Sequence, residues 1–133
     1  HQDRALIPSF TGVENIFLGT SYPTHRGLVD WKTMTRTAQE IADRLGMELD
    51  LSRTAAELSP PQRTELEIIR AVLSDCKLLI LDEPTAALTD REAERLFSVI
   101  RTLKEKGTAI LYVSHRLEEI LTLTDRVIVL RNG

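Results

Sequence analysis

Two acidic residues at the end of an apolar run are the first candidates for chemistry. Asp82 and Glu83 directly follow the apolar residues 78–81, a run typical of a strand buried on both faces of a parallel sheet. Ligands of open α/β sheets bind beyond the carboxyl ends of the strands. Because neighbouring side chains of an extended chain point in opposite directions, one acid could hold Mg²⁺ while the other accepts a proton from an attacking water. The alternative, that the Asp-Glu-Pro sequence only ends the strand, stays open on these residues alone.

Further polar residues stand at the borders of predicted elements. His115 follows a second apolar run, residues 109–113, after a single serine. An imidazole at this place could contact a phosphate oxygen, although a lone histidine after a strand is more often structural. Ser59 and Gln62 form a capping-box pattern at the start of a helix, with Pro60 at the first helical position. Ser59 could therefore cap this helix only, or cap it and also bind a phosphate.

Hydrophobic periodicity predicts the elements that position these residues. The predicted helices cover residues 34–45, 59–73, 90–106 and 116–123, and the predicted strands cover residues 78–81, 109–113 and 127–130. This order predicts a mainly helical first part, residues 1–75, and an α/β layer with right-handed crossovers, residues 76–133. Residues 1–30 carry few periodic signals, and residues 22–27, which include His25, are expected to form a surface loop.

Composition sets limits on the class of protein. The 133 residues suffice for one domain, and the hydrophobic share of 42% allows a buried core. A net charge of -3 with scattered basic residues gives no footprint for nucleic acid or for an anionic membrane surface. The single cysteine, Cys76, excludes an internal disulfide and is expected to be structural. No apolar run reaches the roughly 20 residues of a membrane helix. Since the chain begins without methionine and ends after an apolar run, we expect a piece of a longer protein.

In combination, these segments resemble the ABC ATPases, which have an α/β P-loop NTPase fold. Five elements follow the order of that family: the Q-loop glutamine Gln2, the signature motif at residues 58–62, the Walker B strand with its acid at residues 78–83, the D-loop at residues 86–89 and the switch histidine His115. The resemblance implies a Q-loop and helical signature subdomain followed by the Walker B, D-loop and H-loop part of a RecA-like core. The second part would be the C-terminal portion of a mainly parallel sheet.

Three stretches narrow the resemblance to the ATPases of carbohydrate importers, the ribose, galactose and xylose group. They are residues 13–19, 82–89 and 114–117, and Thr89 replaces the aspartate that many ABC proteins carry in the D-loop. The resemblance implies an ATP-hydrolysing subunit at the cytoplasmic face of the cell membrane. Its implied partners are a membrane permease, a second ATPase domain or subunit in a dimer, and indirectly a periplasmic or extracellular substrate-binding protein. Nucleic acid is not among them.

The resemblance also implies a role for each matched residue, with ATP and Mg²⁺ as ligands. Asp82 would hold Mg²⁺, Glu83 would polarise the attacking water, and His115 would reach the γ-phosphate. Gln2 would contact the metal or the water and relay the state of the site to the permease. The implied nucleotide-binding residues are Gln2, Ser59, Gln62 and Asp82, the metal-binding residues are Asp82 and Gln2, and the catalytic residues are Glu83 and His115. Phosphoryl transfer fits such a set, because it needs positioning and charge neutralisation more than covalent chemistry.

Two features depart from the family. The phosphate-cradling Walker A loop, G-x-x-x-x-G-K-[ST], is absent because none of the six glycines starts it, so the chain alone is expected to be inactive. Pro61 stands where the family usually has a glycine whose N–H holds a phosphate, and proline has no N–H. If the sheet lacks strands and a covering layer, strand edges and apolar patches should be exposed, and self-association is then expected.

Other function classes stay open beside the importer ATPase. A non-catalytic interaction or dimerisation module with a degenerate nucleotide site would fit the missing loop and Pro61. Pro61 itself has two interpretations, a weakened phosphate site or a shifted helix in which Ser59 alone suffices. A soluble ABC ATPase acting on DNA or ribosomes would predict basic arms or a coiled-coil insertion, and these 133 residues contain neither.

Overall fold

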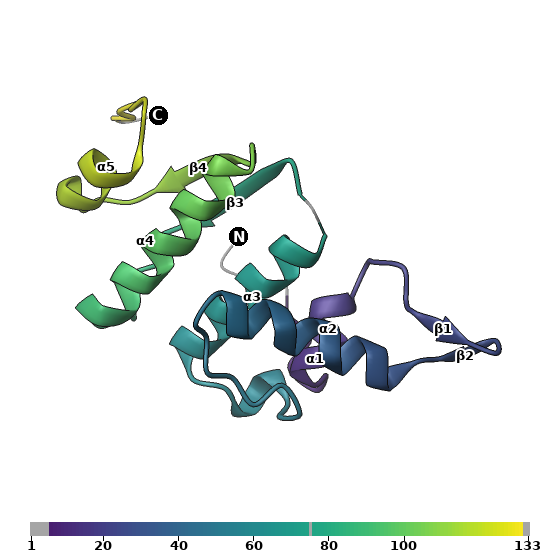
Figure 1. The fold of residues 1–133 in the computed structure, drawn as a ribbon. Helices are drawn as coiled ribbons and strands as arrows, with labels where there is room; N and C mark the ends of the chain where they lie inside the picture. Colours follow the sequence, from purple (N-terminus) through teal and green to yellow (C-terminus); the bar gives the residue numbers. More distant parts are fainter. Residues whose placement is uncertain (1–5, 75, 132–133) are drawn as a thin grey trace. The chain divides into compact units, whose positions relative to one another are not determined.

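The computed structural model describes residues 6–74 and 76–131, and the chain divides into two compact units between Cys76 and Lys77 (Figure 1). The first unit is mainly helical, and the second contains a parallel strand pair with helices. The predicted assignment of residues 1–75 and 76–133 to a signature subdomain and a RecA-like part stays a prediction.

Three α-helices form most of the described part of the first unit. Its elements are α1 (Gly12–Phe17), β1 (Thr24–His25), β2 (Leu28–Val29), α2 (Trp31–Arg44), the 3₁₀ helix η1 (Ala55–Glu57) and α3 (Pro60–Leu73). The helices α1, α2 and α3 contact one another pairwise. Their apolar faces meet around the fully buried side chains of Ile16, Met34, Leu66 and Ile69. The two longer helices agree with the periodicity of the sequence.

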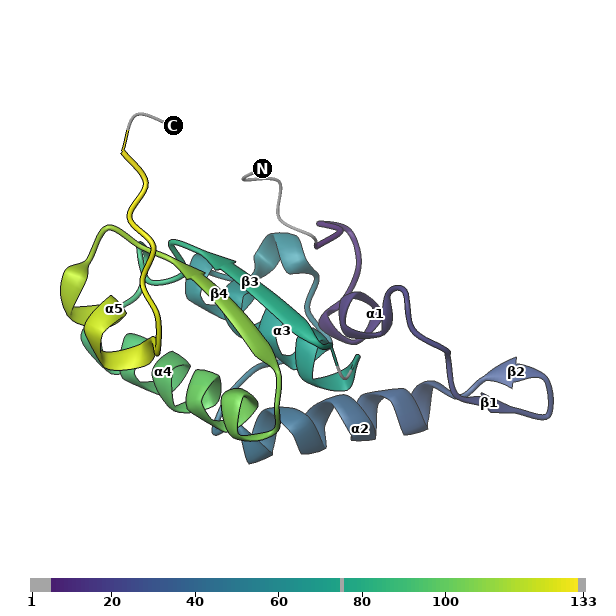
Figure 2. The same ribbon diagram turned by 90° about the horizontal axis from the view of Figure 1, so that it is seen from above.

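The described part of residues 1–30, where few periodic signals were found, contains a helix and a hairpin, and the surface loop expected at residues 22–27 is the exposed turn of this hairpin with its first strand. Thr11 caps α1 and Glu14 bonds back to the Thr11 backbone, which is a capping box that the sequence displays. The hairpin of β1 and β2 turns at Arg26 and Gly27, whose φ angles of 52° and 80° are both left-handed. Two left-handed residues suit the twist of a two-residue hairpin, and Figure 2 shows this hairpin extending beyond the start of α2. His25 lies exposed in β1.

A buried asparagine holds the segment before α1 in place. The Asn15 side chain is fully buried. Its Oδ1 accepts from the Ile7 N–H at 2.7 Å, and its Nδ2 donates to the carbonyls of Ile7, Phe10 and Thr11, each at 3.1 Å. The bond to Oδ1 satisfies the Ile7 N–H, and the bonds from Nδ2 add a second donor to three carbonyls that also accept from the backbone N–H groups of Phe10, Ala55 and Asn15.

The described part of the second unit contains a strand pair and two helices. Its elements are β3 (Leu78–Asp82), α4 (Asp90–Glu105), β4 (Ala109–Val113) and α5 (Leu117–Leu123). β3 and β4 pair in parallel, with Leu78 opposite Ala109 and Asp82 opposite Val113. Between them, α4 begins at a Thr89–Glu92 capping box and presents an apolar face that is buried against the rest of the unit. Both strands and both helices were predicted from the sequence.

The prediction that both strands are buried on two faces was wrong. Exposure alternates along each strand, so Leu81 is buried while Ile80 and Leu111 are 59% and 52% exposed. An unbroken apolar run gives no indication of which face a second layer covers, and here α4 packs on one face only of the strand pair (Figure 2). The expectation of exposed apolar patches is confirmed by this open face, which consists of Leu78, Ile80, Leu111 and Val113.

The predicted strand at residues 127–130 is absent. These residues have no regular secondary structure, and Ile128, Val129 and Leu130 are each 84% exposed. A strand needs a neighbour for its backbone hydrogen bonds, and within the described residues the sheet of this unit consists of β3 and β4 alone. Residues 127–130 have the apolar composition of a strand, but within the described residues no neighbouring strand pairs with them.

We expect Asn15→Leu to destabilise the chain strongly, although leucine has a similar volume and is more apolar. The change removes the acceptor of the Ile7 N–H and a second donor from the carbonyls of Ile7, Phe10 and Thr11, and a buried unpaired N–H alone costs about 1–3 kcal/mol. Urea unfolding followed by circular dichroism should show a loss of at least about 2 kcal/mol. Gln39→Leu, which removes only an exposed bond to Asp43, is the control and should cost less than about 0.5 kcal/mol. Equal losses for both variants would contradict the role given to Asn15.

Candidate functional site

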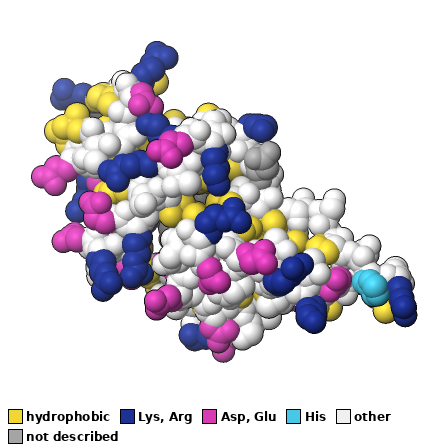
Figure 3. All heavy atoms as spheres, viewed as in Figure 1, with side chains coloured by type: hydrophobic (Ala, Val, Ile, Leu, Met, Phe, Trp, Pro, Cys, Tyr) yellow, Lys and Arg dark blue, Asp and Glu magenta, His cyan; other side chains and the backbone are white. Residues whose placement is uncertain are grey.

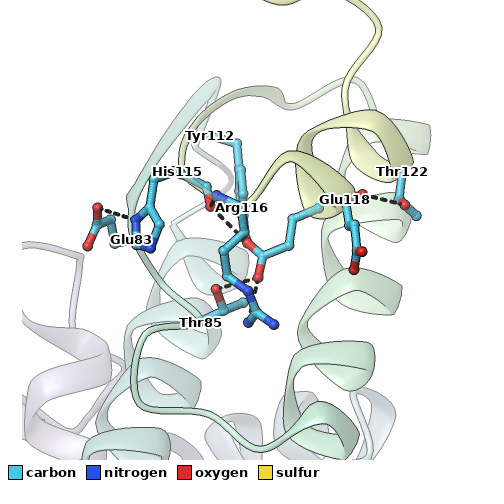
Figure 4. A network of polar contacts seen from close by, with 9 residues as sticks. Glu83, Thr85, Tyr112, His115, Arg116, Glu118 and Thr122 are labelled. Atoms are coloured by element: carbon cyan, nitrogen blue, oxygen red, sulfur yellow. Dashed lines mark hydrogen bonds and ion pairs between the residues drawn. The ribbon is translucent and has the colours of Figure 1, made fainter.

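The ends of β3 and β4 bring three of the predicted site residues to one edge of the strand pair. Asp82 is the last residue of β3 and is exposed on the open face. The Glu83 Oε1 lies 2.9 Å from the His115 Nδ1, although 32 residues separate the two in sequence. Figure 4 shows these two side chains pointing toward one another. The side chains remain accessible, with 51% of Glu83 and 75% of His115 exposed. A ligand could therefore approach both.

The backbone at Glu83 is unusual. Its N–H continues the strand ladder by donating to the Val113 carbonyl at 2.9 Å, yet its φ of 45° is left-handed. A non-glycine residue there is strained by about 1–3 kcal/mol, and such strain tends to occur at functional sites. The left-handed turn bends the chain out of the strand direction immediately after Asp82. Glu83 is thereby directed to His115 instead of following the alternation of the strand.

A buried carboxylate is bonded to residues that lie close to this pair in sequence. Glu119 in α5 is 5% exposed. Its Oε1 accepts from the Thr85 hydroxyl at 2.8 Å and lies 2.9 Å from an Arg116 guanidinium nitrogen. Its Oε2 accepts from the Tyr112 hydroxyl at 2.6 Å and from the Ser114 hydroxyl at 3.1 Å. Figure 4 shows these groups converging from the turn after β3, from β4 and from the turn after β4.

Hydrogen bonding sets the ionisation of this network. Burial by itself raises the pKa of Glu119, but hydrogen bonds from Tyr112, Thr85 and Ser114 and the charge of Arg116 outweigh burial, and the pKa lies below its ordinary value. Burial, followed by the hydrogen bond to Glu119, raises the pKa of the Tyr112 hydroxyl. Glu119 is therefore a carboxylate at neutral pH, and Tyr112 is its neutral donor.

The sequence did not predict Thr85, Tyr112 or Glu119 as members of the site. A glutamate in the first turn of a short helix is usually exposed, and its burial here depends on Thr85, which is 34 residues away. One signal was available. Glutamate at the third helical position commonly bonds its N-cap, but the N-cap of α5 is Arg116, which cannot complete a capping box.

The signature segment lies in the first unit, at the start of α3. Ser59 is the N-cap, its Oγ accepts from the Gln62 N–H at 3.4 Å, and the Gln62 side chain accepts from the Ser59 N–H at 3.0 Å. The predicted capping box is therefore confirmed. Pro60 and Pro61 occupy the first two helical positions and bring no N–H. The Arg63 N–H is already bonded to the Ser59 carbonyl, so the first turn offers a phosphate no unpaired backbone donor.

The described residues give less information on the predicted metal site and on Gln2. Gln2 lies outside the described residues. Among the residues that are described, no group of three or more His, Cys, Asp and Glu side chains could hold a metal ion. Mg²⁺ is commonly held by one or two carboxylates together with phosphate oxygens and waters, so the single exposed Asp82 fits such a ligand set. A shallow hollow along α2, between Trp31 and Asp43, contains none of the predicted residues.

Comparison with known proteins decides the family. Residues 1–86 match the ABC transporter family. The chain belongs to the ABC transporter family. Over its whole length it is 44% identical to the ribose import ATP-binding protein of Bacillus licheniformis, 49% to that of Geobacillus kaustophilus and 47% to that of Lactococcus lactis. The chain spans about 27% of the length of these relatives.

Solved structures give the fold. A dimeric bacterial ABC transporter cassette superposes with a TM-score of 0.69 at 24% identity, covering 90% of this chain and 52% of that one. A nucleotide-free ATP-binding cassette from an ABC transporter gives 0.68 at 26% identity, covering 89% and 50%. The prediction of a partial ABC ATPase fold, α/β with a parallel strand pair, is thereby confirmed.

The surface of this ABC protein agrees with its composition. On the face in Figure 3, acidic and basic side chains are interspersed over both units, without a block of one sign. Among the helices of the described residues, none combines the length and apolar character needed to cross a bilayer.

We expect the difference in stability between wild type and Glu119→Gln to shrink in acid. The lowered pKa of Glu119 means that its contribution is complete above the ordinary value of 4.5 and is lost as the pH falls through the folded-state pKa. At pH 7 the substitution should cost about 2 kcal/mol or more, since bonds to a buried charge are disturbed. Urea titrations from pH 7 to pH 3 measure the difference. The other acid-labile carboxylates are common to both proteins and cancel. A difference that does not change with pH would contradict this assignment.

Proposed function

We propose that this chain is part of the ATP-hydrolysing subunit of an ABC importer that carries a carbohydrate. The contact between Glu83 and His115 beside Asp82 is the observation that carries the proposal. It brings two carboxylates and an imidazole together at the ends of parallel strands. The identity of 44–49% to ribose import ATP-binding proteins supports the carbohydrate assignment. The subunit would work at the cytoplasmic face of the membrane with a permease and a second ATPase domain.

The chain's own residues would divide the chemistry. One oxygen of Glu83 is engaged by the His115 Nδ1, which leaves the other oxygen to accept a proton from a water that attacks the γ-phosphate. In its imidazolium form, His115 can donate from Nδ1 to Glu83 and from Nε2 to a phosphate oxygen. A single imidazole then ties the position of the base to the presence of the phosphate.

Asp82 would hold Mg²⁺, whose chemistry is to neutralise charge on the phosphate oxygens. Gln2 would complete the contacts to the metal or the water, and Ser59 and Gln62 would approach the nucleotide of a partner domain. The chain alone is expected to be inactive, because these 133 residues contain no Walker A loop for the β- and γ-phosphates.

We expect Glu83→Gln, made in the full-length protein, to lower the rate of ATP hydrolysis by about 100-fold or more while ATP still binds. Glutamine keeps the shape of the side chain but cannot accept the proton, and a general base contributes about 10²–10⁴-fold. Steady-state phosphate release and binding of a fluorescent ATP analogue measure the two effects. Glu94→Gln, on an exposed position of α4, is the matched control and should stay within about twofold. Hydrolysis that survives in Glu83→Gln rejects Glu83 as the base.

A second candidate function is a non-catalytic interaction module. The observation in its favour is the start of α3, where two prolines leave a phosphate no free backbone N–H. In this interpretation the protein pairs with an ATPase partner without supporting turnover through its own signature.

We expect Pro61→Gly in the full-length protein to raise ATPase activity, because it restores an N–H at the second position of α3. One charge-assisted hydrogen bond is worth about 1.5–3 kcal/mol, which limits the gain to roughly 10–100-fold. Pro61→Ala restores the same N–H without added backbone freedom and should give a similar gain. If neither variant hydrolyses ATP faster, the proline does not weaken the site. If wild type and both variants are inactive, the module interpretation is favoured.

A further inference from the structure

Glu119 makes contacts that its position in α5 does not require. It is the third residue of its helix, the place at which Glu14, Glu57, Gln62 and Glu92 each bond back to their own N-cap. Those four side chains accept from the N-cap backbone N–H, whereas the structure gives Glu119 a bond only to the side chain of its N-cap, Arg116. Its carboxylate takes hydroxyl donors from Thr85, Tyr112 and Ser114, all outside α5, and the Arg116 guanidinium. The side chain therefore serves the two turns and not the helix that carries it.

These donors lie next to the predicted catalytic pair. Thr85 is two residues after Glu83 and is 3% exposed, and Ser114 directly precedes His115. The Ser114 Oγ also accepts from the Arg116 N–H at 3.0 Å, so the backbone on both sides of His115 is fixed. One buried carboxylate thus links the segment that carries Glu83 to the segment that carries His115.

The catalytic pair needs such support. The Glu83–His115 contact is exposed on both sides, and exposed ion pairs contribute little to holding a geometry. The left-handed backbone at Glu83 is also unfavourable by itself. By contrast, the bonds of Glu119 are buried and made to a charged acceptor, which makes them strong. The bonds of Glu119 are therefore the rigid part of this region, and the segments that carry Glu83 and His115 are held by them.

We propose that Glu119 is a positioning residue that sets the distance between Glu83 and His115 by clamping the turns after β3 and β4. The inference rests on the proposed ATPase function. Glu119 itself touches neither nucleotide nor water in this scheme. Removing one of its bonds should therefore change the rate of hydrolysis and not the affinity for ATP.

The test is a double-mutant cycle in the full-length protein. Glu119→Gln keeps the volume but removes the charge, and it should lower kcat about tenfold with the KM for ATP changed less than about twofold. In a His115→Ala background the same substitution should lower kcat less than about twofold, because the pair it positions is already broken. An equal loss in both backgrounds would show a merely structural role and overturn the proposal.

Thr85→Val removes a hydroxyl donor of Glu119 and leaves Glu119 itself in place. This second variant tests the proposal even if Glu119→Gln does not fold. Valine matches the shape of threonine but has no hydroxyl, so it should give the same split between kcat and KM. Lys104→Met is the control, because it breaks a tie to Leu123 and Asp125 in the same unit without touching either turn. It should lower the melting temperature and leave kcat unchanged. If Thr85→Val and Lys104→Met behave alike, Glu119 has no positioning role.

Hydrogen exchange separates failure of this inference from failure of the proposed function. In Glu119→Gln, peptides covering residues 82–88 and 113–117 should exchange faster, whereas peptides of α4 should not. If the wild-type protein hydrolyses no ATP, the proposed function fails, but faster exchange in these two peptides still supports the clamp. Unchanged exchange in both peptides would reject the clamp whatever the activity.

Discussion

The parallel pairing of β3 and β4 is the constraint on which the candidate site depends. In the register that sets Asp82 opposite Val113, the residues after both strands leave the sheet at the same edge. The ladder continues by one bond, from the Glu83 N–H to the Val113 carbonyl, and this places Glu83 beside the turn that carries His115. A slip of one residue would reverse the faces of all these side chains and separate the pair. The helix α4 makes the parallel arrangement possible, because it returns the chain to the starting end of the sheet before β4.

Local signals in the sequence predicted most of the helices and both paired strands. Capping boxes at Ser59 and Thr89 fixed where α3 and α4 begin, because each box satisfies backbone donors that a helix start leaves unpaired. The same pattern stands at Thr11, but α1 has only six residues and shows no periodicity that could reveal it. Burial that depends on residues far apart in the sequence could not be predicted from local signals. The position of Glu119 depends on Thr85, and the open face of the sheet depends on which layers cover it, so neither follows from a run of residue types.

Ser59 shows how folding and phosphate binding can compete for the same groups. The start of α3 is well capped, since Ser59 and Gln62 satisfy each other and Arg63 donates its side chain to the carbonyls of Ala55 and Ala56. Proline at the first helical position stabilises such a start, because its missing N–H would have been unpaired. The same prolines remove backbone N–H donors that an anion would use at a helix N-terminus. A helix start optimised for stability in this way is a poor phosphate site unless Ser59 releases its bond to Gln62.

The open face of the strand pair bears on the strength of the site. Asp82 ends the same row of side chains as Leu78 and Ile80, so its carboxylate stands in water as they do. Two charges 4 Å apart interact with about 1 kcal/mol in bulk water and about 4 kcal/mol near a protein surface of lower effective dielectric. A layer covering the apolar row would therefore also strengthen the hold of Asp82 on a cation. The chain places Asp82 at the strand end, but its described residues do not provide the low-dielectric surroundings in which this carboxylate would bind a cation strongly.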